Sequence, residues 1–223
     1  MTILVFDLDD TIYEEFSFVK SGYKAVSEYL SFEFNISASE IYEKMLLIYK
    51  SQGRSLLFNK ILEIYGVSNR KILNKLIQIY RTHIPDLELN EEVKELLLRL
   101  SCKYSLYIVT DGNRFVQQRK IDALMLESFF KKIFITRNYG LKAEKPSLHC
   151  FKKILSMEKS DNWSDLIYVG DNPNKDFIKL KEQGSKTIRI NNGLFKNIKF
   201  PIEYEAHVTI NSIVNLESVL KNA

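Results

Sequence analysis

The stretch ILVFDLDDT, residues 3–11, decides how the rest of the chain is interpreted. Its first four residues are apolar and stop abruptly at Asp7, which is typical of a buried parallel strand with acidic side chains after its carboxyl end. Ligands of open α/β sheets bind at that end of the strands. We therefore expect Asp7, Asp9 and Asp10 to lie at a functional edge of a sheet.

After Pro85, helical and extended patterns alternate along the chain. Helices are expected at 91–100, 114–125, 147–156, 175–183 and 212–220, and strands at 105–110, 132–136, 166–170, 186–190 and 207–210. Strands separated by helices indicate right-handed crossovers and a mostly parallel sheet that is covered on both faces. The predicted fold class is α/β, with a doubly wound, Rossmann-like core formed by residues 1–15 and 87–223.

Between the first two strands, residues 16–86 show only helical spacing, which predicts about four helices in an inserted cap domain. Ser37 and Glu40 have the spacing of a capping box at the start of one of them. The tyrosines of the insert also recur at helical spacing, which favours packing in its core over a base-stacking platform. These tyrosines are Tyr23, Tyr29, Tyr42, Tyr49, Tyr65 and Tyr80.

The composition excludes several classes of function. The net charge of +4 arises from 32 basic and 28 acidic residues without a dense basic tract, so nucleic acid is not the expected partner. Only two cysteines occur, Cys102 and Cys150, without the Cys/His spacing of a metal site, so they suggest neither a zinc site nor a disulfide framework. No apolar run approaches the length of about 20 residues that a membrane span needs. We expect a cytoplasmic monomer or homodimer.

Polar residues also follow the later predicted strands or begin the helix between them; they are Thr110, Asp111, Gly112, Lys145, Asp171 and Asp176. Carboxylates gathered in one place repel one another, so they imply a bound cation, and oxygen ligands without His or Cys favour Mg²⁺. Thr110 and Lys145 then need an anion to hold, and a phosphoryl group meets both demands. Lys142 is an alternative to Lys145, but Pro146 suits the first turn of a helix and favours Lys145.

Four motifs therefore occur in order: DLDDT at 7–11, Thr110, Lys145 and GDNPNKD at 170–176. In these motifs the sequence resembles the haloacid dehalogenase superfamily, over nearly the whole chain if the insert is counted as the small helical cap of that family. The resemblance implies a phosphatase in which Asp7 attacks phosphorus and forms an aspartyl phosphate. It implies that Asp9 first protonates the leaving oxygen and later takes a proton from water.

The resemblance also assigns the remaining site residues. Thr110 and Lys145 would hold the phosphoryl oxygens, and Asp111 and Gly112 are counted with them as substrate-binding residues. Mg²⁺ would be bound by Asp7, the backbone carbonyl of Asp9 and Asp171, with Asp176 assisting directly or through water.

The expected substrate is a small phosphorylated metabolite of the sugar phosphate or nucleotide class. A phosphomutase or phosphotransferase would share the four motifs, and a binding protein could share the fold. A haloacid dehalogenase needs no metal and lacks an acid at the position of Asp9. We expect the insert to act as a lid that selects the leaving group, with Arg54, beside the Gly53 break, as a substrate contact.

Overall fold

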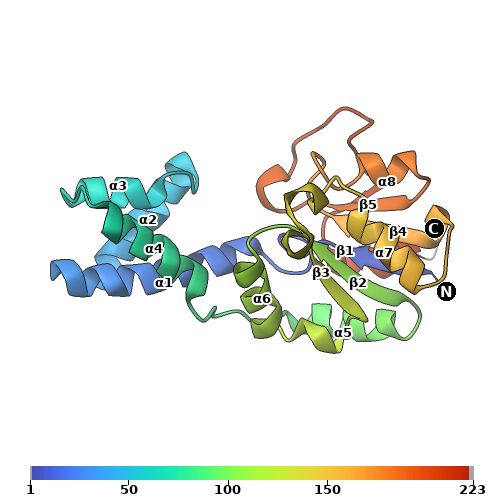
Figure 1. Cartoon of the computed structure of the whole chain (residues 1–223), viewed down its shortest axis with the longest axis horizontal. Coiled ribbons are helices and arrows are strands. Elements are labelled where there is room, and N and C mark those ends of the chain that lie inside the picture. Colours follow the sequence, from blue (N-terminus) through green and yellow to red (C-terminus); the bar gives the residue numbers. More distant parts are fainter. Residues whose placement is uncertain (1, 221–223) are drawn as a thin grey trace. The chain divides into compact units, whose positions relative to one another are not determined.

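The computed structural model describes residues 2–220 and forms two compact units. The core unit consists of Met1–Glu15 and Glu88–Ala223, and the insert unit consists of Phe16–Leu87. The chain leaves the core unit after its first strand and returns before the second, as the colours of Figure 1 show. Each unit has its own buried apolar cluster.

The core unit is built on a six-stranded sheet whose neighbouring strands are all parallel. Its strands are β1 (Ile3–Phe6), β2 (Ser105–Thr110), β3 (Lys132–Ile135), β4 (Leu166–Gly170), β5 (Lys186–Ile190) and β6 (Val208–Ile210), in the order β3-β2-β1-β4-β5-β6. The chain adds strands first on one side of β1 and then on the other, so the crevice used for ligands in such sheets opens at the carboxyl ends of β1 and β4. The predicted α/β fold class is confirmed.

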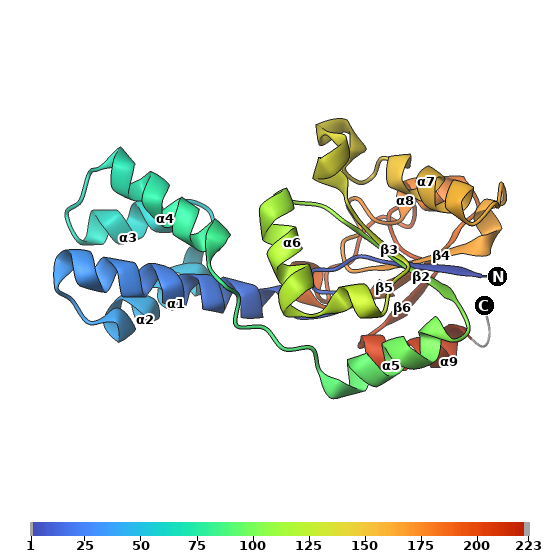
Figure 2. The same cartoon turned by 60° about the horizontal axis from the view of Figure 1, so that its bottom comes forward.

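Helices cover both faces of this sheet. They are α5 (Glu91–Ser101), α6 (Arg114–Ala123), α7 (His149–Met157), α8 (Ile178–Glu182) and α9 (Leu216–Leu220), and Figure 2 shows α7 and α8 on one side with α5 and α9 on the other. Because side chains alternate along a strand, Ile3 and Val5 join the apolar cluster that includes Ile154 of α7. Phe6 faces the opposite way, and its ring packs edge-on against Phe130 at 5.8 Å.

Three helix starts differ from their prediction, and one of them is α9, which begins at Leu216 rather than at 212 because a 3₁₀ turn at Ile213–Asn215 comes first. Helix α7 begins at His149 rather than at 147, and Pro146 lies before its first turn. The reason is a turn closed by the Ser147 amide, which donates to the Glu144 carbonyl at 2.9 Å and delays the helix. Helix α8 begins at Ile178, because a turn in which the Asp176 amide donates to the Asn172 carbonyl comes first.

The insert unit contains four helices, α1 (Glu15–Phe34), α2 (Ala38–Gln52), α3 (Leu57–Ile64) and α4 (Arg70–Thr82). All six tyrosines named above belong to or pack against its apolar cluster, so the packing prediction is confirmed. The predicted capping box is wrong. The Ser37 hydroxyl pairs with the Ser39 hydroxyl at 2.7 Å, and Glu40 is held by Lys44 at 2.6 Å, so neither side chain caps the helix.

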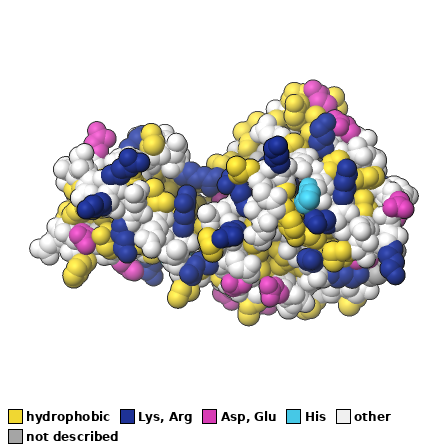
Figure 3. Space-filling model, viewed as in Figure 1, with side chains coloured by type: hydrophobic (Ala, Val, Ile, Leu, Met, Phe, Trp, Pro, Cys, Tyr) yellow, Lys and Arg dark blue, Asp and Glu magenta, His cyan; other side chains and the backbone are white. Residues whose placement is uncertain are grey.

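On the face of the core unit viewed in Figure 3, lysine and arginine side chains lie in separate groups between apolar and uncharged ones. The small excess of positive charge is therefore not gathered into one continuous band on that face. No helix within residues 2–220 combines the length and the apolar character that crossing a bilayer requires.

Candidate active site

Three of the predicted site residues, Asp7, Thr110 and Asp171, lie at the ends of three adjacent strands. Asp7 directly follows β1, and its amide continues the sheet by donating to the Val169 carbonyl of β4 at 2.8 Å. Thr110 is the last residue of β2, and Asp171 follows the last residue of β4. Because β1 lies between β2 and β4, these residues come together at one edge of the core unit.

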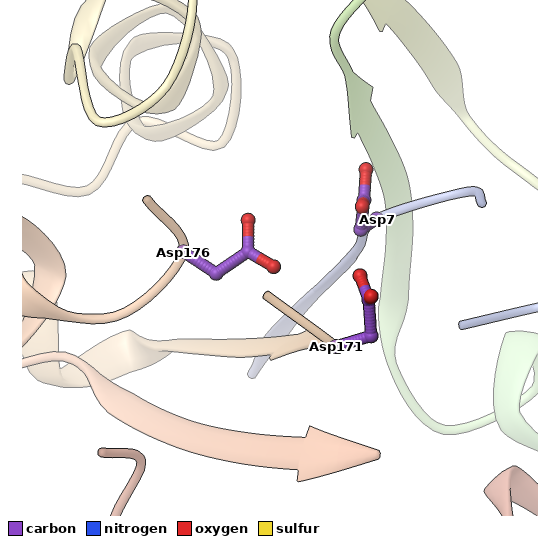
Figure 4. Close-up of side chains that lie close together, drawn as sticks. All are labelled: Asp7, Asp171 and Asp176. Carbon is purple, nitrogen blue, oxygen red and sulfur yellow. The ribbon is translucent and has the colours of Figure 1, made fainter. Parts of the chain in front are cut away.

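Three buried carboxylates form the centre of the site. Asp7, Asp171 and Asp176 each place one oxygen within 4.8 Å of the others, and Figure 4 shows the three groups converging, Asp7 from the end of β1 and the other two from the segment between β4 and α8. Burial, followed by the neighbouring acids, raises the pKa of Asp171 to about 9. Burial also raises the pKa of Asp7 to about 6, despite the opposing charge of Lys145.

Lys145 lies among these acids with a side chain that is only 1% exposed. Its ammonium group is 2.8 Å from Asp7 Oδ1 and 2.8 Å from Asp176 Oδ1, and it donates to the Tyr168 hydroxyl at 2.8 Å. Burial alone would lower the pKa of Lys145, but the charges of Asp176 and Asp7 raise it well above its usual value. Lys142, the alternative, is exposed.

Asp176 is held firmly in this arrangement. Its Oδ2 accepts from the Asn172 amide at 2.9 Å, and its Oδ1 accepts from the Tyr168 hydroxyl at 3.2 Å. Gly170 leaves the necessary space, since a Cβ there would lie 2.5 Å from Asp176 Oδ2. The carboxylate is therefore placed by the backbone of its own loop before any ligand binds.

The donor set fits a hard divalent cation. Asp7, Asp171 and Asp176 offer oxygen atoms only, which suits Mg²⁺. Lys145 compensates one of the three negative charges that the acids carry when ionised, so a net negative charge remains for a cation to neutralise. The raised pKa values of Asp7 and Asp171 have the same origin, because carboxylates that are buried together hold protons when no cation is bound.

The Asp9 side chain lies outside this acidic group. Its Oδ1 accepts from the Tyr13 hydroxyl and from Lys120 Nζ, each at 2.7 Å, and its Oδ2 accepts from Gln117 Nε2 at 3.0 Å. Burial would raise the pKa of Asp9, but the Lys120 charge and the three hydrogen bonds bring it below its usual value. A carboxylate with its own set of donors is distinct from the three that fit a cation.

Thr110 is 1% exposed, and its Oγ1 accepts from Gln117 Nε2 at 2.6 Å. The acceptor of the Thr110 hydroxyl proton is the Asp111 carbonyl, at the long distance of 3.5 Å. Gly112 has φ of +125°, a conformation that side chains disfavour, and it turns the chain from the strand toward α6. The hydroxyl proton of Thr110 is thus held only weakly by the protein.

Asp111 joins four segments of the core unit. Its Oδ1 accepts from the Thr136 hydroxyl at 2.8 Å and from the Lys145 amide at 3.1 Å, and its Oδ2 accepts from Lys175 Nζ at 3.0 Å. These bonds connect the end of β2 with the chain segments that carry Lys145 and Lys175. A role of Asp111 in binding substrate remains a prediction.

Sequence analysis missed four residues of the site: Tyr13, Gln117, Lys120 and Tyr168. Gln117 and Lys120 are three positions apart on α6, a spacing that places both on one side of a helix. Such a pair, directly after the Thr110 motif, is the signal that could have identified them. Arg54 lies exposed in the insert unit between α2 and α3. Burial raises the pKa of Tyr23, and the charge of Arg54 opposes part of that increase.

Comparison with known proteins gives a consistent family. The model of the haloacid dehalogenase-like hydrolases matches residues 4–190. The glyceraldehyde 3-phosphate phosphatase of Methanocaldococcus jannaschii is 28% identical over 98% of this chain and 96% of its own length. The human N-acylneuraminate-9-phosphatase is 26% identical over 70% of this chain and 62% of its own length.

Solved structures show the same fold. The magnesium-bound HAD hydrolase YfnB of Bacillus subtilis has a TM-score of 0.68 at 20% identity and covers 98% of each chain. The 2-haloacid dehalogenase of Pseudomonas syringae has a TM-score of 0.66 at 20% identity, covering 100% of this chain and 99% of its own. The HAD phosphatase of Thermococcus onnurineus has a TM-score of 0.60 at 22% identity, covering 99% and 98%.

Proposed function

We propose that this chain, which belongs to the haloacid dehalogenase-like hydrolase family, is a Mg²⁺-dependent phosphatase that acts through an aspartyl phosphate on Asp7. The observation that supports this most strongly is the position of the Asp7 carboxylate. It lies at a strand end, 2.8 Å from the Lys145 ammonium and within 4.8 Å of Asp171 and Asp176 oxygens. The nucleophile Asp7, the Lys145 ammonium group that would bind phosphoryl oxygens and the carboxylates that would bind the metal thus lie together.

In the first half-reaction, an Asp7 oxygen attacks phosphorus while the bond to the leaving oxygen breaks. Lys145 and the Thr110 hydroxyl bind phosphoryl oxygens and stabilise their charge, which is most valuable in a buried site. Asp9, whose lowered pKa means that it must first take up a proton, gives that proton to the leaving oxygen, which departs as an alcohol. Attack by Asp7 divides hydrolysis into two easier steps.

In the second half-reaction, Asp9 accepts a proton from water as the water oxygen attacks the phosphorus of the aspartyl phosphate. Asp7 leaves as a carboxylate, and inorganic phosphate remains. Mg²⁺, held by Asp7 and Asp171 with the Asp9 backbone carbonyl and Asp176, would neutralise negative charge on the phosphoryl group when bound. Lys120, Tyr13 and Gln117 keep the Asp9 carboxylate in one place through both steps.

The proposed substrate is a small sugar phosphate. Relatives named glyceraldehyde 3-phosphate phosphatase, from Methanocaldococcus jannaschii and Pyrococcus furiosus, align with 98% of this chain, insert included. The phosphatases named for N-acylneuraminate 9-phosphate align with only 70% of it. A three-carbon sugar phosphate such as glyceraldehyde 3-phosphate is therefore the first compound to test.

The test is phosphate release from a panel of sugar phosphates, nucleotides and p-nitrophenyl phosphate, with Mg²⁺ and with EDTA. We expect Mg²⁺-dependent release, with the highest kcat/KM on a short sugar phosphate, and no release by Asp7→Asn. Halide release from a 2-haloacid in EDTA, without phosphatase activity, would instead identify a dehalogenase. Formation of an isomeric sugar phosphate without inorganic phosphate would identify a phosphomutase.

A further inference from the structure

The side chain of Gln117 joins two groups with different tasks in the proposed reaction. Its Nε2 lies 2.6 Å from Thr110 Oγ1, a proposed phosphoryl ligand, and 3.0 Å from Asp9 Oδ2, the proposed acid and base. Gln117 is 2% exposed and lies in the second turn of α6. Its amide therefore lies between the residue proposed to bind the phosphoryl group, Thr110, and the residue proposed to transfer the proton, Asp9.

Hydrogen-bond chemistry fixes the direction of both bonds. In the ionised form of Asp9, which its lowered pKa favours and which acts as the base in the second half-reaction, the carboxylate can only accept, so the amide atom that faces it is the nitrogen. The same NH₂ group then supplies its second proton to Thr110 Oγ1. Because Thr110 accepts there, its own O–H points elsewhere, and its only acceptor within the described core is the Asp111 carbonyl at 3.5 Å. The Thr110 proton is left for a phosphoryl oxygen.

The local structure at the start of α6 places the Gln117 side chain. The Asn113 side chain accepts from the Phe115 and Val116 amides at 3.0 and 3.3 Å and sets where the helix begins. Gly112 leaves room for the amide, since a Cβ there would lie 3.4 Å from Gln117 Cδ and Cγ. One turn later, Lys120 Nζ donates to Asp9 Oδ1 at 2.7 Å and lies 3.9 Å from Glu15 Oε1.

We propose that Gln117 is a positioning residue that aims the Thr110 hydroxyl at the phosphoryl group and holds the Asp9 carboxylate for protonation of the leaving oxygen. This inference rests on the proposed phosphatase function. Lys120 shares the second of these tasks, because its ammonium group donates to Asp9 Oδ1 at 2.7 Å. Substituting Gln117 should therefore affect both phosphate binding and proton transfer, whereas substituting Lys120 should affect proton transfer. A purely structural role would not separate the two variants in this way.

The experiment compares Gln117→Leu and Lys120→Met with the wild type on two substrates, an alkyl phosphate and p-nitrophenyl phosphate. The alkoxide needs a proton to leave, whereas p-nitrophenolate does not, so misplacing Asp9 should slow the alkyl substrate selectively. We expect both variants to raise the aryl-to-alkyl ratio of kcat/KM about tenfold or more, a part of the 10²–10⁴ that general acid catalysis contributes.

Inhibition by inorganic phosphate separates the two variants. Gln117→Leu removes the 2.6 Å bond that fixes Thr110 Oγ1, so the hydroxyl is no longer aimed and we expect about tenfold weaker inhibition, the equivalent of one lost hydrogen bond. Lys120→Met leaves the bond between Gln117 and Thr110 in place, so inorganic phosphate should inhibit this variant as strongly as it inhibits the wild type. Both readouts, a ratio of substrates and an inhibition constant, are independent of how much of a preparation is folded.

Gln118→Leu is the matched control. Gln118 is the neighbouring glutamine of α6, exposed and bonded to Asp122 at 2.8 Å, so its removal should change neither readout. A wild-type substrate ratio and wild-type phosphate inhibition in Gln117→Leu, in an active enzyme, would overturn the positioning role and leave the phosphatase proposal standing. An inactive wild type, or a fully active Asp7→Asn, would instead overturn the phosphatase proposal itself.

Discussion

Binding of Mg²⁺ to the metal-free protein should release about one proton at pH 7. The cause is Asp171, whose pKa burial and the charges of Asp7 and Asp176 raise to about 9. A carboxyl group with that pKa is about 99% protonated at pH 7, and a protonated carboxyl cannot act as a metal ligand. The cation must therefore displace the proton, while Asp7, with a pKa of about 6, is already largely ionised.

The size of the effect on affinity follows from the same values. Between about pH 6 and pH 9 the apparent affinity for Mg²⁺ should fall about tenfold for each unit of decreasing pH, because one proton competes with the cation. Below about pH 6 the fall should be steeper, since Asp7 then begins to hold a proton as well. At pH 7 the affinity should lie about 100-fold below its value above pH 9.

Titration calorimetry measures the proton directly. Mg²⁺ is titrated into metal-free enzyme at pH 7 in several buffers, and the slope of binding enthalpy against buffer ionisation enthalpy gives the number of protons released. Asp10→Asn is a suitable control, because Asp10 is a buried acid outside the group of three whose charge contributes less to the raised pKa of Asp171 than the charges of Asp7 and Asp176 do. It should keep a slope near one. A slope near zero in the wild type, with affinity independent of pH, would refute the assignment of Asp171 as a protonated ligand.

Three further results are expected. Asp9→Asn should lower kcat on a sugar phosphate about 10²–10⁴-fold while sparing KM, as measured by steady-state phosphate release, since it removes the acid and base but no proposed phosphoryl ligand. Ca²⁺ should fail to replace Mg²⁺ and should inhibit it in a competition assay, because its larger, looser shell positions a phosphoryl group poorly. Arg54→Ala should lower kcat/KM for the natural substrate but not for p-nitrophenyl phosphate; equal losses on both would argue against a role in leaving-group recognition.

The sequence contained enough to predict the sheet and the edge at which the candidate site residues gather. Apolar runs that stop at Asp7, Thr110 and Gly170 are buried strands with acids or hydroxyls after them, and the structure places all three at the carboxyl ends of adjacent parallel strands. The resemblance to the haloacid dehalogenase superfamily is confirmed by the match over residues 4–190. The prediction succeeded because a strand that is buried on both faces needs a continuous run of apolar residues, and the first polar residue marks where that run ends.

The residues that surround the site were not predictable in the same way. Gln117 and Lys120 are polar residues on a helix, and polar helical residues usually face solvent; only the placement of α6 beside the strand ends buries them. Tyr168 lies in an apolar run and resembles a core residue, yet its hydroxyl contacts Lys145. Such roles depend on which segments meet in space, and spacing along one chain does not record that.

Local rules also failed where nearby polar groups competed. Ser37 and Glu40 had the spacing of a capping box, but Ser39 and Lys44 bind their side chains instead. Pro146 suited a first helical turn, but the Ser147 amide closes a turn with Glu144 before α7 begins. In both places a hydrogen bond between near neighbours took precedence over the predicted local pattern.

The central claim is tested most directly by trapping the phosphoryl group on Asp7. Asp9→Asn with p-nitrophenyl phosphate and Mg²⁺ should accumulate the intermediate, because this leaving group needs no acid while attack by water still needs the base. After an acid quench, borohydride reduction of an aspartyl phosphate yields homoserine, which mass spectrometry locates. The account predicts homoserine at position 7 and none in an Asp7→Asn variant. Phosphorylation of another residue, or near-normal turnover by Asp7→Asn, would contradict it.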